Sequence, residues 1–267
     1  MNDLSLINTF FKENNFNPSK KMGQNFLINK NICMQMVSKI EINITSNISS
    51  IIEIGPGLGA LTELLINKCN RLTVIELDKR LADFIKRKYG NIEVINNDIL
   101  NVDLDKISTN NTILVSNLPY SISSLVFIKF LKSKLNVFYC MIQKEMADRI
   151  LAKPSSKKFN SFTVIINYCC AVERLLNVNR NNFFPSPNVD SVVIKLIKKN
   201  NYDKLFDNFI SLCFASKRQT LYNNLKKKYD KEKISNILFK FNLDQKIRAE
   251  AIDINTLHNI FCYLVIK

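Results

Sequence analysis

A chain of 267 residues, 46% of them hydrophobic, can bury one sizeable core and a smaller second one, which indicates a globular protein. Its formal net charge of +15 favours an anionic partner, nucleic acid before membrane, although a coding bias toward Lys, Asn and Ile could produce the same charge. Seven scattered cysteines without a C-x-x-C pair, and a single histidine, argue against a disulfide framework and a zinc site. We expect a cytoplasmic protein without a metal, since we find no targeting segment and no apolar run of membrane-spanning length.

The first organised stretch of the chain is a strand, a glycine turn and a helix. After a polar, basic segment (residues 20–27) and a helical pattern (residues 32–40), the β-branched run 51–54 leads into the glycine-rich turn 55–60 and an apolar helix face. This order opens a nucleotide-binding βα unit. A second strand, residues 72–75, ends at Glu76, whose carboxylate can accept hydrogen bonds from both hydroxyls of a ribose. A third strand, residues 94–95, is followed by Asp98, an acceptor that suits an adenine amino group.

The glycine turn alone leaves two cofactors open. Gly55, Gly57 and Ala60 satisfy the fingerprint of dinucleotide-binding enzymes, so a nicotinamide cofactor has to be weighed. Against it, Pro56 removes one amide N–H from a loop that would need donors for a pyrophosphate, and the loop has no basic residue. S-adenosylmethionine has a ribose, an adenine and a cationic sulfonium but no phosphate. Acidic side chains at the strand ends, with no basic residue in the turn, therefore favour S-adenosylmethionine over a nicotinamide cofactor.

A fourth strand, residues 112–115, leads into Asn117-Leu118-Pro119-Tyr120, which we interpret as a site for an exocyclic base amine. Such an amine is a weak nucleophile because its lone pair is delocalised into the ring, and hydrogen-bond acceptors favour a pyramidal nitrogen. The Asn117 side-chain oxygen and the Leu118 carbonyl are candidate acceptors. Pro119 would hold the turn and Tyr120 could stack on the base. The alternative is an ordinary turn, in which Asn and Pro are common.

The remaining pattern continues as α/β and then becomes helical. We predict a helix at 123–131, a strand at 137–142, a polar helical segment at 143–152, a basic loop at 153–158, apolar runs at 162–168 and 172–178, and a strand at 192–196. Before that strand, Pro185 and Pro187 stiffen a loop that would fix Phe183 or Phe184, unless these rings only plug the core. From about residue 200 the apolar spacing is helical.

We therefore predict an α/β fold of two domains. Residues 1–198 form a Rossmann-like, S-adenosylmethionine-binding catalytic methyltransferase domain, and residues 199–267 form a small all-helical C-terminal domain. In the second domain, Lys217, Arg218 and the lysines 226–228 could bind RNA phosphates, although a charge run is usually a solvated face.

These motifs, in this order, resemble those of the KsgA-type ribosomal RNA adenine dimethyltransferases. The resemblance covers nearly the whole chain, through the strings KKMGQNFL, EIGPGLGALT, VIELD, NND, NLPY, FFPSPNVDSVV, CFASKRQTLYNNL and RAE. The Erm resistance methyltransferases share the cofactor residues, but KRQTLYNNL and RAE resemble the housekeeping branch. The resemblance implies an S-adenosylmethionine-dependent enzyme of small-subunit ribosomal RNA, and we expect a monomer.

The resemblance implies roles for the cofactor residues. Asn25 and Leu27 would fold over S-adenosylmethionine. Gly55, in the same turn as Gly57, would lie against its methionine moiety. Glu76 would bind the ribose hydroxyls.

It also implies roles for residues at the adenine of the cofactor and at the target base. Asp98 would bind the adenine of the cofactor, and Asn117 would border both cofactor and target. Tyr120 and Phe183 would enclose the target base between them. The family's substrate is a pair of adjacent adenosines in a hairpin loop near the 3′ end of small-subunit (16S-type) ribosomal RNA, each methylated twice.

Four positions depart from the family pattern, and two other functions stay open. Lys21 and Met22 replace Arg and Phe, Ser186 replaces Pro, and Asn160 replaces Gly, which a left-handed backbone would tolerate. A non-catalytic RNA-binding assembly factor is the main alternative, and a nicotinamide dehydrogenase is a more distant one.

Overall fold

The structure, a computed structural model, describes residues 4–19, 23–41 and 50–266. Its contacts divide the chain into two compact units, Met1–Ala147 with Val172–Lys198, and Asp148–Ala171 with Lys199–Lys267. The boundary predicted after residue 198 assigns residues 148–171 to the first domain, whereas their contacts group them with the C-terminal residues. The physical reason is that helix α8 (Ser161–Cys169) packs on α9 (Lys204–Cys213).

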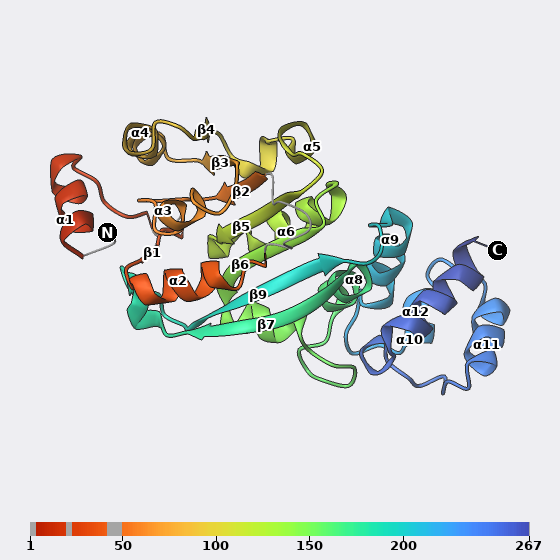
Figure 1. Cartoon of the computed structure of the whole chain (residues 1–267). Coiled ribbons are helices and arrows are strands. Elements are labelled where there is room, and N and C mark those ends of the chain that lie inside the picture. Colours follow the sequence, from red (N-terminus) through yellow and green to blue (C-terminus); the bar gives the residue numbers. More distant parts are fainter. Residues whose placement is uncertain (1–3, 20–22, 42–49, 267) are drawn as a thin grey trace. The chain divides into compact units, whose positions relative to one another are not determined.

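The first unit is built on a seven-stranded sheet with the strand order β4-β3-β2-β5-β6-β9-β7 (Figure 1). The pairs β2–β3, β2–β5, β3–β4 and β5–β6 are parallel, and β9 is antiparallel to β6. The predicted α/β class is confirmed. The strands are β2 (Ser50–Ile54), β3 (Arg71–Glu76), β4 (Glu93–Asn96), β5 (Thr112–Asn117), β6 (Val137–Gln143), β7 (Cys170–Val178) and β9 (Ser191–Lys198).

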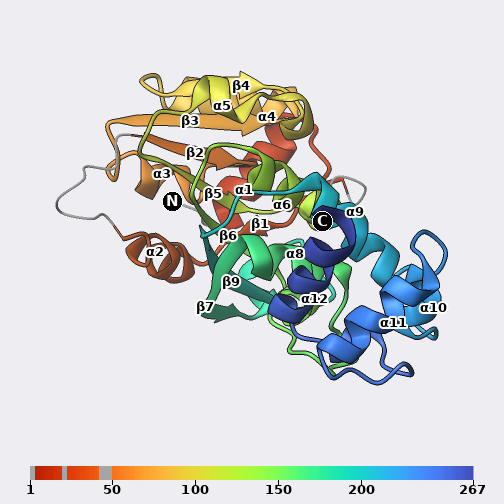
Figure 2. The ribbon, with the colours of Figure 1, turned by 90° about the vertical axis from the view of Figure 1, so that its right-hand side faces the viewer.

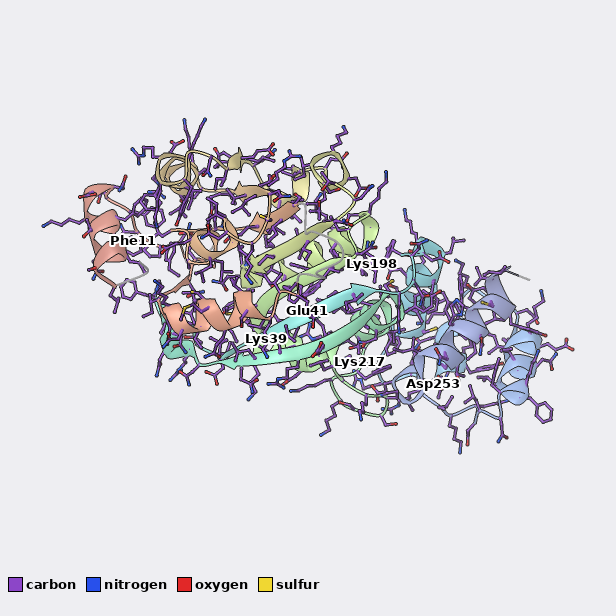
Figure 3. The ribbon with its side chains drawn as sticks, in the orientation of Figure 1. Phe11, Lys39, Glu41, Lys198, Lys217 and Asp253 are labelled. Carbon is purple, nitrogen blue, oxygen red and sulfur yellow. The ribbon has the colours of Figure 1, made fainter. Side chains whose placement is uncertain are left out.

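Helices cover both faces of this sheet, because apolar side chains point to both sides of its central strands. On one face lie α2 (Lys30–Ser38), α3 (Thr62–Leu65) and α4 (Lys79–Lys88), which share one buried cluster with the strands. On the other face lies α6 (Ser123–Lys132), whose Phe127 ring is 5.8 Å from that of Phe138. Figure 2 shows the strands of this sheet in their order, from β4 at the top to β7 at the bottom. Glu41, just after α2, forms an ion pair with the buried Lys195 of β9, which ties this end of the helix to the sheet (Figure 3).

The N-terminal segment packs over the glycine turn. Helix α1 (Leu4–Glu13), which the sequence interpretation did not include, contributes Phe10 and Phe11 to a cluster of aromatic rings. In this cluster the Phe11 ring lies 5.6 Å from Phe26 and 6.1 Å from Phe184. The strands β1 (Phe26–Leu27) and β8 (Phe183–Phe184) pair antiparallel in a separate two-stranded sheet. Two segments far apart in the sequence thus meet beside the turn.

The second unit is helical after residue 199, as predicted. Its core includes Phe206, whose ring lies 4.5 Å from Tyr168 and 5.2 Å from Phe261. Asn160 is extended (φ −157°) rather than left-handed, and its side chain caps α8 by accepting a hydrogen bond from Thr163 N at 3.2 Å. The Gly-to-Asn departure is therefore accommodated as a helix cap. Besides α8 and α9, the unit has α10 (Leu221–Leu225), α11 (Lys231–Lys240) and α12 (Ile254–Phe261).

Short helical segments complete the chain: η1 (Ile99–Asn101), α5 (Leu104–Ile107), η2 (Tyr120–Ile122), α7 (Lys144–Ile150), η3 (Arg180–Asn182), η4 (Ala249–Ala251) and η5 (Cys262–Ile266). Across the described ranges, no helix is long and apolar enough to cross a membrane. Of the other departures from the family pattern, Ser186 donates its hydroxyl to Arg180 O at 3.0 Å, and Lys21 and Met22 lie outside the described residues.

Candidate active site

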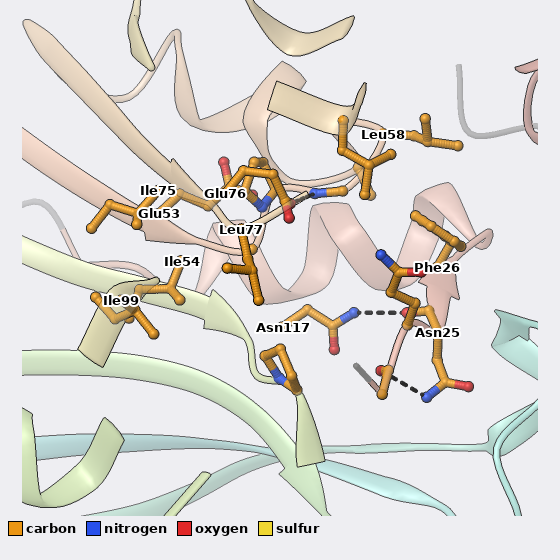
Figure 4. Close-up of a pocket in the computed structure, with 18 of the residues that line it drawn as sticks. Asn25, Phe26, Glu53, Ile54, Leu58, Ile75, Glu76, Leu77, Ile99 and Asn117 are labelled. Carbon is orange, nitrogen blue, oxygen red and sulfur yellow. Dashed lines mark hydrogen bonds between the residues drawn. The ribbon is translucent and has the colours of Figure 1, made fainter. Parts of the chain in front are cut away.

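A cavity of about 390 Å³ lies where the parallel strands end, at the carboxyl edge of the sheet (Figure 4). It is lined by the turn after β2, the ends of β3 and β5, the residues after β4, and residues 23–27 of the N-terminal segment. The structure brings all the predicted cofactor residues to this cavity, namely Asn25, Leu27, Gly55, Gly57, Glu76, Asp98 and Asn117. Of the other predicted catalytic residues, Pro119 also lines it, whereas Leu118, Tyr120 and Phe183 are not among its lining residues.

The turn after β2 needs glycine because its backbone is left-handed at Gly55 (φ +66°) and Gly57 (φ +58°). A Cβ atom built on Gly57 would lie 3.2 Å from two ring carbons of Phe26. The Phe26 ring therefore rests directly on the turn, and any side chain at this position would push it away. The turn and the N-terminal segment form one continuous wall of the cavity.

Glu76 ends β3 with its carboxyl group fixed by the backbone. Its Oε2 accepts a hydrogen bond from Gly57 N at 3.2 Å, and its Oε1 accepts one from Asp78 N at 3.0 Å. Burial raises the pKa of Glu76 to about 7, and these two N–H donors oppose the rise because they favour the ionised form. Each oxygen has a second lone pair that can accept a ribose hydroxyl. Two hydroxyl donors would favour the carboxylate further.

Asp98 follows β4 and lines the cavity at the same edge of the sheet. Its Oδ1 caps η1 by accepting from Leu100 N at 2.8 Å, which fixes the orientation of the group. From the part of the chain that the structure describes, Oδ2 receives no hydrogen bond. Asp98 can therefore accept a bond from an adenine amino group while it keeps its structural one.

Glu53 is a third carboxyl group in the cavity wall, and the sequence interpretation missed it. It lies within β2, is 1% exposed, and accepts a hydrogen bond from the Thr62 hydroxyl at 2.7 Å. Burial, together with repulsion from Glu76, raises the pKa of Glu53 to about 8. Glu53 is therefore mainly neutral at pH 7. The sequence feature that could have indicated Glu53 is a charged residue within an otherwise apolar strand.

Asn117 ends β5 with its amide oriented by the N-terminal segment. Its Nδ2 donates to Asn25 O at 3.3 Å, and Asn25 Nδ2 in turn donates to Gly23 O at 3.1 Å (Figure 4). No described donor bonds Asn117 Oδ1. The oxygen end of this amide is therefore available to accept from an N–H group.

The turn that follows presents a second acceptor. Leu118 N donates to Met141 O at 3.0 Å, which anchors the turn to β6, while the Leu118 carbonyl accepts nothing from the described residues. The next carbonyl, that of Pro119, is already occupied by Ile122 N at 3.3 Å and the Ser123 hydroxyl at 3.1 Å. The candidate acceptors are therefore the two that the sequence predicts, Asn117 Oδ1 and the Leu118 carbonyl.

The two candidate stacking rings occupy different environments. Tyr120 is half-buried, its hydroxyl is 2.8 Å from Ser191 Oγ, and burial raises its pKa. Phe183 is only 3% exposed, in the core cluster shared with Leu27, its strand partner. A base can reach the Phe183 ring only if the β1–β8 region moves, so the predicted enclosure of the base by Tyr120 and Phe183 stays a prediction.

The chemistry of the lining fits S-adenosylmethionine better than a dinucleotide. The described lining is mostly apolar, includes Glu53, Glu76 and Asp98, and contains no lysine or arginine. A pyrophosphate would find no cationic side chain among these described residues, whereas an uncharged adenosine and a cationic sulfonium suit acids. Within residues 4–19, 23–41 and 50–266, no cluster of three His, Cys, Asp or Glu side chains could hold a metal ion.

Comparison with known proteins finds similarity along almost the whole chain. Residues 15–265 match the model of a family described as Ribosomal RNA adenine dimethylase. A Ureaplasma parvum serovar 3 protein named Ribosomal RNA small subunit methyltransferase A is 43% identical over 275 residues, which cover 97% of this chain and 98% of the relative. A dimethyladenosine transferase from Plasmodium falciparum has a similar structure, with a TM-score of 0.76 and 26% identity over 88% of this chain and 95% of its own. The 23S rRNA methyltransferase ErmE shares the fold, with a TM-score of 0.69 and 22% identity over 90% and 99% of the two chains.

Proposed function

Because the chain belongs to the ribosomal RNA adenine dimethylase family, whose cofactor is S-adenosylmethionine, we propose that it dimethylates two adjacent adenosines in a hairpin loop near the 3′ end of small-subunit (16S-type) ribosomal RNA. The small-subunit substrate is supported by the name of the Ureaplasma parvum relative, and the adenosine target by that of the Plasmodium falciparum structure. The role would be in small-subunit biogenesis.

The observation that carries this proposal is the pair of unoccupied acceptors at the end of β5. Asn117 Oδ1 and the Leu118 carbonyl lie beside a cavity whose acids suit a cationic nucleoside. Both amine hydrogens of an adenine could bond to them. A pure RNA-binding protein has no need for such acceptors beside Glu76 and Asp98.

In the proposed mechanism the chain acts mainly by positioning. When bound, S-adenosylmethionine supplies a methyl group carried by a cationic sulfur. Asn117 Oδ1 and the Leu118 carbonyl hold the two N–H groups of the target amine, favour its pyramidal form and point its lone pair into the cavity. Tyr120 would stack on the unpaired base, which costs less to unstack in a hairpin loop than in a duplex. The extra proton on the nitrogen leaves to water, so no general base is required.

Glu76 and Asp98 would hold the cofactor. Glu76 would accept the ribose hydroxyls and Asp98 the adenine amino group, while Gly55 and Gly57 let the backbone approach the methionine moiety. Residues 25–27 would close over it.

The exposed basic residues of the second unit support a contact with RNA. Lys217, Arg218 and the lysines 226–228 are all exposed. We propose that catalysis belongs to residues 1–198 except residues 148–171, and that residues 199–267 contact the ribosomal particle. Residues 148–171 are grouped with the latter by their contacts. We propose that the enzyme acts in the cytoplasm, where small subunits are assembled. We also propose that it acts as a monomer.

Transfer of a labelled methyl group to unmethylated small ribosomal subunits tests the proposal. With labelled S-adenosylmethionine, the wild type should label two adjacent adenosines of one hairpin loop, as mapped by digestion and mass spectrometry. The Asn117→Ala variant should lose about 10²-fold or more in turnover, the scale on which one positioned hydrogen-bonding group acts in a transition state. Its cofactor affinity, measured by calorimetry, should fall by no more than about 10-fold, because Asn117 is expected to supply at most one bond to the cofactor.

Three results would contradict the proposal in different ways. No label in RNA from the wild type would remove the enzymatic function and favour the assembly-factor alternative if subunits still bind. Label on other nucleotides would change the substrate. Near wild-type turnover by Asn117→Ala would remove the acceptor role while leaving the reaction.

A further inference from the structure

The segment that borders the cofactor cavity is tied directly to the loop that carries Phe183. Leu27 in β1 is the strand partner of Phe183 in β8. Just beyond this pair, Ile28 N donates to Asn182 O at 2.8 Å, and the side chain of Asn29 donates through Nδ2 to Asn182 Oδ1, also at 2.8 Å. Backbone and side chains thus join the two segments at three successive positions.

Both amide groups of this link are held in one orientation by other bonds. Asn29 Oδ1 caps α2 by accepting from Asn31 N at 2.9 Å and Ile32 N at 3.4 Å. Asn182 Nδ2 donates to Asn179 O at 2.8 Å. Rotating either amide would set an N–H group against an N–H group, or an oxygen against a carbonyl. The link between Asn29 and Asn182 is therefore specified, and not one of several equivalent contacts.

We propose that Asn29 and Asn182 are positioning residues that make the binding of cofactor and of target RNA cooperative. The inference rests on the proposed function, in which the loop around Phe183 meets the target base. On one side of the link, residues 25–27 line the cofactor cavity. On the other side, Phe183 follows Asn182 directly. Because a base can reach Phe183 only if the β1–β8 region moves, the link transmits that movement: a cofactor that shifts residues 25–27 also shifts β8, and RNA that shifts β8 also shifts residues 25–27.

This coupling is reciprocal by thermodynamic necessity. If the cofactor tightens RNA binding by a certain factor, RNA must tighten cofactor binding by the same factor. Residues that only support the fold would change both affinities without changing that factor. The factor is therefore the quantity to measure.

Three substitutions separate the link from the surrounding bonds. Asn29→Asp keeps an oxygen for the α2 cap, loses the donor to Asn182 and sets a carboxylate oxygen against Asn182 Oδ1. Asn182→Ala removes the acceptor from the other side, together with the bond to Asn179 O. Asn182→Asp also loses the bond to Asn179 O but keeps the acceptor for Asn29, so it is the matched control.

The experiment measures the affinity of the full-length protein for unmethylated small ribosomal subunits with and without S-adenosylhomocysteine, and the affinity for S-adenosylhomocysteine with and without subunits. For the wild type we expect a coupling factor of at least about fivefold, identical in both directions. Asn29→Asp and Asn182→Ala should lower this factor by about 2- to 5-fold, toward one, which lies within the range that the net contribution of one hydrogen bond corresponds to. Asn182→Asp should keep the wild-type factor. Thermal unfolding midpoints confirm that each variant is folded.

Each alternative result decides the question. A wild-type factor of one, or a full factor in Asn29→Asp, overturns the inference. If Asn29→Asp does not fold, the comparison of Asn182→Ala with Asn182→Asp decides alone, and equal factors in these two overturn it. Wild-type methylation of the same subunits is the control for the proposed function, so a failure of the coupling with methylation intact refutes only the inference.

Discussion

Replacing the buried Glu53 by glutamine should make the protein more stable and its stability less dependent on pH. The side chain is 1% exposed, and burial raises its pKa from 4.5 to about 8. Glutamine has nearly the same shape, keeps an oxygen for the Thr62 hydroxyl, and cannot ionise. The substitution therefore removes the titration and little else.

The sign and size of the effect follow from proton linkage. Between the unfolded pKa of 4.5 and the folded pKa of about 8, the folded state holds a proton on Glu53 that the unfolded state has lost. The free energy of unfolding of the wild type must therefore fall as pH rises through this range, by about 1.4 kcal/mol per pH unit from this group. At pH 7 the accumulated loss is about 3 kcal/mol, which Glu53→Gln should recover.

Urea unfolding of the wild type and Glu53→Gln between about pH 5 and pH 8 tests this reasoning, since the window lies inside the range of linkage. The two profiles of unfolding free energy should diverge steadily with pH. Glu173→Gln, a substitution at an exposed position of β7, is the matched control and should run parallel to the wild type. Parallel profiles for Glu53→Gln would show that Glu53 is not held neutral in the folded protein.

Substitutions at Gly57 and at Tyr120 test the wall of the cavity and the stacking ring. Gly57→Ala should weaken the binding of S-adenosylmethionine, as measured by calorimetry, because a φ of +58° costs an alanine about 1 kcal/mol and its Cβ would displace the Phe26 ring. Gly90→Ala is the control and should bind the cofactor as the wild type does, since no atom lies within 4 Å of its Cβ. Equal cofactor affinities of Gly57→Ala and Gly90→Ala would refute the tight contact between the turn and the Phe26 ring. Tyr120→Phe should keep most of the kcat/KM for methylation, although it loses the hydrogen bond to Ser191. Tyr120→Ala should lose about 1 to 3 kcal/mol of stacking free energy with the base. A defect of the same size in both variants would assign the role to the hydroxyl instead of the ring.

The sequence was sufficient to predict the parts of the site that lie at strand ends. Strands that read as short β-branched runs, such as residues 51–54 and 72–75, are β2 and β3 of the sheet. Since parallel strands end at one edge, Glu76, Asp98 and Asn117 were expected together, and all three line one cavity. The order of the strands along the chain was enough to predict that these residues lie together, because the topology of such sheets is regular.

Contacts between distant segments could not be predicted in this way. The burial of Phe183 depends on its pairing with Leu27, and neither local sequence indicates that partner. Helix α1 was missed because its aromatic residues pack against rings from distant segments, Phe10 against Phe84 and Phe11 against Phe26 and Phe184. Glu53 lies inside a strand rather than at its end, so a rule about strand ends does not reach it.

In the proposed site, the two acceptors beside the cavity would set a limit on how many methyl groups can be added with equal ease. Asn117 Oδ1 and the Leu118 carbonyl match the two hydrogens of a primary amine. A monomethylated adenine has only one hydrogen left, so during the second transfer one acceptor must face water or remain without a donor. A buried acceptor in that state costs about 1 to 3 kcal/mol. The second methylation would therefore depend on the stacking of the base far more than the first.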